Sequence, residues 1–66
     1  MYQLQVENMS CGHCVGSVTK AVQAIDPQAQ VQIDLASKRV TVESSSELGA
    51  ISAAIVEAGY PVTRAQ

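Results

Sequence analysis

The sequence lacks tryptophan and phenylalanine, and two tyrosines are its only aromatic residues. Because 47% of the 66 residues are nonetheless hydrophobic, the core of the folded chain has to be aliphatic. A chain near this length buries only about 60% of the surface that its unfolded form exposes, so it cannot build a second core. We therefore expect residues 1–66 to form a single domain with a stability of only a few kcal/mol.

Long hydrophobic runs and an excess of basic charge are also missing. No apolar run approaches the roughly 18 residues of a membrane span, and the N-terminus alternates polar and apolar residues, unlike a signal peptide. We expect a cytoplasmic protein with no membrane insertion. The 4 basic and 6 acidic side chains give a net charge of -2, which lacks the positive surface that nucleic acid requires. We therefore expect no nucleic-acid partner.

Cysteine is scarce, and both cysteines lie in one short segment. That segment reads Met9-Ser10-Cys11-Gly12-His13-Cys14. A disulfide between its two cysteines would close a very small loop and would hardly constrain the unfolded chain. In a reducing cytosol, a Cys-x-x-Cys pair is more often metal-binding or catalytic than structural. The sequence thus leaves two interpretations, a metal carrier and a redox catalyst.

The hydrophobic spacing predicts six elements. Period-2 alternation predicts strands, and recurrence at three and four residues predicts amphipathic helices. The predicted strands cover about residues 2–7, 30–35, 39–43 and 60–64, and the predicted helices about 14–25 and 48–58. Asp26 and Pro27 end the first helix, and Gly59 ends the second. Ser44 and Glu47 match a capping box for the second helix.

The order strand, helix, strand, strand, helix, strand is that of a ferredoxin-like βαββαβ sandwich, an α+β fold. Such a chain forms a four-stranded antiparallel sheet. Both helices lie on one face of it, because their apolar stripes have to pack on the inward residues of the strands. The cysteine pair then straddles the junction between the first strand and the first helix.

Two thiols at this junction suit a soft metal ion. Cys11 lies in the loop and Cys14 in the first helical turn, where unpaired N–H groups and the helix dipole stabilise thiolates. With no further thiol in the chain, the pair favours a metal of low coordination number, and Cu(I) fits best. Zn(II) prefers four ligands and would need a second copy of the chain.

The redox interpretation rests on the same four residues, from Cys11 to Cys14. Cys11-Gly12-His13-Cys14 is also the active-site tetrapeptide of protein disulfide isomerases, in which the histidine makes the pair more oxidising. The thioredoxin-like fold of those enzymes needs a longer chain and usually has an aromatic residue before the first cysteine. Here Ser10 precedes Cys11, and Pro61 falls in the last predicted strand. We therefore expect no enzymatic activity and keep a thiol-disulfide oxidoreductase as the alternative.

The segment resembles the Met-x-Cys-x-x-Cys motif of the heavy-metal-associated domain family, and the predicted order of elements agrees with that family. The resemblance covers the whole chain and is greatest to the free bacterial copper chaperones, whose motif often has a histidine where His13 stands. It implies that Cys11 and Cys14 bind Cu(I) in near-linear geometry. It also implies that Met9 packs beneath the loop as a core anchor, and that Tyr60 lies close to the metal.

His13 within the motif and Asn8 immediately before it need separate interpretation. His13 is expected to be a solvated side chain, and the alternative is a metal ligand in a dimer or a residue just outside the ligands. Asn8 departs from the family, which commonly has glycine before the methionine. Asparagine also tolerates a left-handed backbone, so the loop can still turn there.

The family resemblance also implies partners. The expected recipient of the copper is a copper-transporting P-type ATPase, whose N-terminal domains share this fold, with a copper-responsive regulator as a further candidate. We expect a free protein, with a metal-binding domain cut from such an ATPase as the alternative, and Hg(II) is an alternative cargo. We expect a monomer without metal and, as an alternative with metal, a copper-bridged homodimer.

Overall fold

The hydrophobic spacing of the sequence produces the predicted elements in the predicted order. The computed structural model describes residues 1–9 and 12–66. Its elements are β1 (Tyr2–Val6), α1 (Gly12–Ile25), β2 (Gln30–Asp34), β3 (Arg39–Glu43), α2 (Leu48–Glu57) and β4 (Val62–Ala65). The predicted bounds differ from these by two residues at most. The differences lie at element ends, where periodicity carries the least information.

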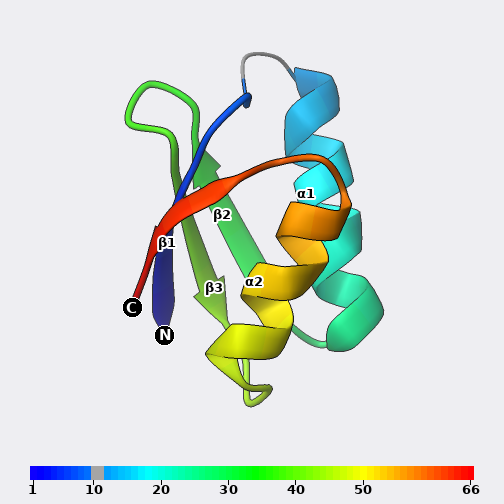
Figure 1. Cartoon of the computed structure of the whole chain (residues 1–66). Coiled ribbons are helices and arrows are strands. Elements are labelled where there is room, and N and C mark those ends of the chain that lie inside the picture. The colour runs from blue at the N-terminus through cyan, green and yellow to red at the C-terminus, as the bar shows by residue number, and fades with distance from the viewer. Residues whose placement is uncertain (10–11) are drawn as a thin grey trace.

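The four strands form one antiparallel sheet in the order β2-β3-β1-β4. Both helices cover the same face of it (Figure 1), so the predicted ferredoxin-like α+β fold is confirmed. In β1 and β3, alternate residues are buried under the helices, because successive side chains of a strand point to opposite faces. Leu4 pairs with Val40 across the two strands, and both side chains are almost fully buried.

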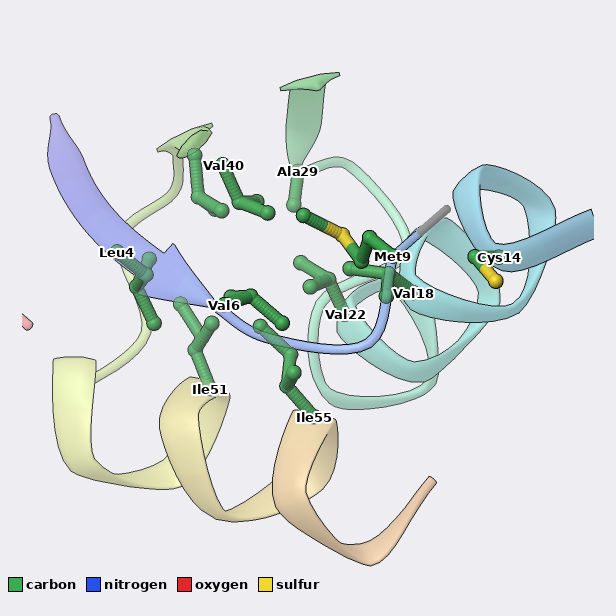
Figure 2. Close-up of a cluster of buried hydrophobic side chains, with 11 residues drawn as sticks. Leu4, Val6, Met9, Cys14, Val18, Val22, Ala29, Val40, Ile51 and Ile55 are labelled. Atoms are coloured by element: carbon green, nitrogen blue, oxygen red, sulfur yellow. The ribbon is translucent and has the colours of Figure 1, made fainter. Parts of the chain in front are cut away.

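The core is aliphatic, as the absence of tryptophan and phenylalanine predicts. Its buried members are Leu4, Val6, Met9, Cys14, Val18, Val22, Ala29, Val40, Val42, Ile51 and Ile55. Figure 2 shows these side chains filling the space between the sheet and the two helices. Tyr2 and Tyr60 pack against this cluster but remain partly exposed.

Two large hydrophobic residues that lie within the predicted helix 14–25 and the predicted strand 30–35 are exposed, although their spacing places them on the apolar sides of these elements. Ile25 is the last residue of α1 and is 42% exposed. Leu35 was predicted to continue β2, but that strand ends at Asp34, which pairs with Arg39, and Leu35 starts the turn and is 37% exposed. Hydrophobic periodicity shows which side of an element is apolar. It does not show where the neighbouring element stops covering that side.

The predicted capping box is wrong. The N-cap residue of α2 is Glu47, and its side chain makes no capping hydrogen bond. The Ser44 hydroxyl instead donates to the Asp26 carboxylate at 2.6 Å, and its oxygen accepts the Ser46 amide at 3.0 Å. A charged acceptor gives a stronger hydrogen bond than a neutral backbone group, which explains why Ser44 turns toward Asp26. The other end of α2 is as predicted, since Gly59 follows it with a φ of 100°.

The contact between Ser44 and Asp26 should be visible in a pH titration. The hydrogen bond from Ser44, with a backbone hydrogen bond from Gln28, holds the pKa of Asp26 below its usual value of 3.8. The contact therefore stabilises the fold above pH 3.8, and this stabilisation is lost as the pH falls through the lowered pKa. We expect Ser44→Ala to raise the pKa of Asp26 toward 3.8, as measured by carboxyl chemical shifts in NMR.

Ser45→Ala is the matched control, because the neighbouring Ser45 acts on Asp26 through its backbone and not through its hydroxyl. It should leave the titration of Asp26 almost unchanged. An equal rise of the Asp26 pKa in both variants would show that the Ser44 hydroxyl is not the main cause of the shift.

Among the described residues, neither helix has the length and apolar character needed to cross a lipid bilayer.

Candidate metal centre

The candidate site lies where β1 leads into α1. The turn between β2 and β3 and the segment from α2 to β4 lie at the same end of the molecule as the end of β1 (Figure 1). Of the predicted ligands, Cys14 is described, whereas Cys11 lies outside the described residues, as does Ser10. The geometry of the site is therefore described from Cys14 and from the residues near it at this end of the molecule.

Cys14 is the third residue of α1 and therefore lies in the first helical turn, as predicted. Its side chain is 9% exposed and forms the edge of the hydrophobic core near the N-terminus of α1 (Figure 2). The Cys14 thiol donates a hydrogen bond to the carbonyl oxygen of Asn8 at 3.5 Å. The positive end of the helix dipole favours a negatively charged sulfur at such a position.

Met9 is buried, with 3% of its surface exposed. Its side chain points into the core toward Ala29 and Val40 (Figure 2). A thioether among aliphatic side chains acts as flexible packing material, and here it joins the segment before α1 to the sheet. This burial suits a core anchor, the role that the resemblance implies for Met9.

His13 is exposed on the first turn of α1. Tyr60 lies in the segment between α2 and β4 and is half-buried against the core. The carbonyl of the next residue, Pro61, accepts the Glu7 amide at 2.8 Å. This hydrogen bond joins the segment that carries Tyr60 to the end of β1, immediately before Asn8.

The described structure adds Asn8 to the residues that shape the site. Its φ is 67°, a left-handed conformation that asparagine adopts more readily than most residues. The sequence already indicated this possibility, because asparagine stands where the family commonly has glycine. The contact between the Asn8 carbonyl and the Cys14 sulfur could not be read from the sequence, because it depends on the path of the chain between them.

The turn between β2 and β3 supports the same end of β1. The Lys38 carbonyl accepts the Val6 amide at 2.9 Å, and the Lys38 ammonium lies 3.6 Å from the Glu7 carboxylate. Both charged side chains are substantially exposed, so this ion pair contributes little to stability. Of the two contacts from Lys38, the backbone hydrogen bond is therefore the one that helps to hold the strand end in place.

With residues 10 and 11 left aside, the structure brings together no group of three or more histidine, cysteine, aspartate or glutamate side chains that could hold a metal ion.

Comparison with known proteins identifies the family. Residues 3–61 match the model of the heavy-metal-associated domain, so the chain belongs to that family. Within it, the sequence is closely similar to copper chaperones. It is 37% identical over 62 residues to the copper chaperone CopZ of Staphylococcus aureus, a match that covers 89% of this chain and 91% of that protein.

The fold agrees with that of a solved copper chaperone. The Cu2 form of copper chaperone Atx1 from Synechocystis PCC6803 superposes with a TM-score of 0.87 at 47% identity, covering 91% of this chain and 95% of that one. The chain is also 35% identical over 65 residues to copper-transporting ATPase 2 of Rhizobium meliloti, which covers 94% of this chain. This chain spans only 8% of the length of that ATPase, and 8% of the length of a second copper-transporting ATPase from the same organism.

Proposed function

We propose that this protein is a copper chaperone that binds Cu(I) through Cys11 and Cys14 and passes it to a partner protein. One observation carries the proposal. The Cys14 sulfur sits at the N-terminus of α1, at the edge of the core, in a chain whose similarity to a copper chaperone extends over 91% of that protein's length. Residues 1–66 act as one metal-binding domain in this proposal.

Transfer then proceeds by exchange of thiolate ligands. An ion held by two sulfurs can accept a third thiolate from a partner before it loses one of its own, because Cu(I) tolerates low coordination numbers. The metal therefore never has to leave its ligands for water. Tight binding and rapid transfer become compatible in this way, and the domain needs no catalytic group.

The proposed recipient is a metal-binding domain of a copper-transporting P-type ATPase, and a copper-responsive regulator is a further candidate. Similarity to two such ATPases over about nine-tenths of this chain supports the first of these partners. The same similarity favours a second candidate function, in which the chain is itself one metal-binding domain of such an ATPase. We place the protein in the cytoplasm and take it as a monomer without metal, with a copper-bridged homodimer as the alternative.

The test is a transfer experiment under anaerobic conditions. The protein is loaded with one equivalent of Cu(I), mixed with the isotopically labelled metal-binding domain of a copper ATPase, and followed by NMR. We expect copper to appear on the domain faster than it appears on a small chelator of equal affinity. Transfer no faster than to the chelator would contradict the chaperone function, and turnover in an insulin-reduction assay would support an oxidoreductase.

His13 should affect Cu(I) binding only indirectly. Its side chain is exposed on the first turn of α1, where water can solvate it. We expect His13→Ala to change the pH dependence of binding or dimerisation more than the Cu(I) affinity at neutral pH. Chelator competition at several pH values and size-exclusion chromatography measure the two effects. Replacing a residue that only contacts a metal ligand usually lowers metal affinity by less than about 100-fold. A loss of about 100-fold or more in neutral-pH affinity would therefore identify His13 as a ligand.

A further inference from the structure

Asn8 has an unusual backbone conformation at a critical place. Among the described residues other than glycine, only Asn8 and Lys38 have a positive φ. Asn8 stands between the end of β1 and the buried Met9, so it sets the direction in which the chain leaves the sheet. Most residues are disfavoured in this left-handed region, whereas glycine and asparagine adopt it readily.

The residues on both sides of Asn8 are held by contacts that do not involve its side chain. Before it, the amides of Val6 and Glu7 donate to the carbonyls of Lys38 and Pro61 at 2.9 and 2.8 Å. After it, the Met9 side chain is buried in the core. Asn8 lies between these two fixed points, and it is the residue there that has the left-handed φ.

The turn at Asn8 has a direct consequence for the site. It places the Asn8 carbonyl oxygen 3.5 Å from the Cys14 sulfur, which donates a hydrogen bond to it. This hydrogen bond links the Cys14 side chain on α1 to the segment that follows β1. A change of the Asn8 backbone would move the carbonyl away and release the sulfur from this contact.

We propose that Asn8 is a positioning residue for metal binding, because its left-handed turn places its carbonyl at Cys14 and so orients the Cys14 sulfur. This inference rests on the proposed function and specifies which backbone feature that function needs. Alanine at position 8 shifts the apo-chain away from the left-handed turn at little cost, whereas the metal-bound chain still needs the Cys14 sulfur oriented toward the ion. Loss of the turn should therefore lower metal affinity more than it lowers the stability of the apo-protein.

The test compares Asn8→Ala with Asn8→Gly. Alanine disfavours the left-handed conformation and glycine permits it, while both remove the asparagine side chain. We expect Asn8→Ala to weaken Cu(I) affinity about fivefold in anaerobic chelator competition, as a modest backbone penalty implies. Asn8→Gly should bind like the wild type. The thermal midpoints of the two apo-proteins, measured by circular dichroism, should lie close together.

A second measurement needs no metal. Alkylation of Cys14 by iodoacetamide, resolved by peptide mass spectrometry, reports how well the sulfur is held in the apo-protein. We expect Cys14 in Asn8→Ala to react several-fold faster than in the wild type, and Cys14 in Asn8→Gly to react at about the wild-type rate. If Asn8→Ala does not fold, Asn8→Ser supplies the same comparison, because serine also disfavours the left-handed conformation and keeps a polar side chain.

The outcomes separate this inference from the proposed function. A wild-type chain that cannot compete for Cu(I) would overturn the proposed function and this inference with it. Tight wild-type binding together with unchanged affinity and unchanged Cys14 reactivity in Asn8→Ala would overturn the inference alone. Equal losses in Asn8→Ala and Asn8→Gly would also overturn it, because they would assign the effect to the side chain.

Discussion

Replacement of either cysteine with serine should lower Cu(I) affinity by more than about 100-fold, because loss of a residue that only contacts a metal ligand already costs up to about that much. A serine hydroxyl is a hard, neutral ligand at neutral pH, and Cu(I) prefers soft thiolates. The remaining cysteine alone cannot complete a two-coordinate site. Anaerobic titration of Cys11→Ser and Cys14→Ser against a strong competing chelator measures the loss.

Folding has to be checked in the same experiment, because Cys14 belongs to the buried cluster. We expect Cys14→Ser to lower the thermal midpoint but to retain the circular dichroism of the native fold. Ser17→Ala is a suitable control, since Ser17 is an exposed residue of the same helix. It should leave affinity and stability nearly unchanged. Tight Cu(I) binding that survives in either cysteine variant would show that the proposed bis-thiolate site is wrong.

Ile55→Ala should unfold most of the protein at 37 °C. Ile55 is fully buried on the face of α2 that packs in the core (Figure 2). Truncation of a buried isoleucine to alanine costs about 2–5 kcal/mol, which is comparable to the total stability expected for a chain of this size. Thermal and urea denaturation followed by circular dichroism would reveal the loss of the native baseline.

The next residue provides a matched control for this effect. Val56 lies on the same helix but is 49% exposed. Val56→Ala should change the free energy of unfolding by no more than about 0.5 kcal/mol, because it leaves no cavity and alanine favours a helix. Equal midpoints for Ile55→Ala and Val56→Ala would contradict the description of the core.

The six elements could be predicted from the sequence because each one carries its own periodic pattern. Hydrophobic residues alternate with polar ones in β1 and β3, and two of these hydrophobic residues, Leu4 and Val40, are buried. Ser44 was assigned to the wrong partner for a different reason. Its hydroxyl could form a hydrogen bond either with the nearby amides of α2 or with the Asp26 carboxylate, which is 18 residues away in the sequence. The local sequence pattern indicates only the first of these partners.

By itself, the sequence determined the order of the strands and helices, the aliphatic character of the core and the position of Cys14 in the first turn of α1. These features depend on local spacing and composition. Only the tertiary structure decided that the Glu7 amide donates to the Pro61 carbonyl and that the Asn8 carbonyl reaches the Cys14 sulfur. The physical reason is that such contacts join separate elements, so they exist only after the sheet and the two helices have packed together.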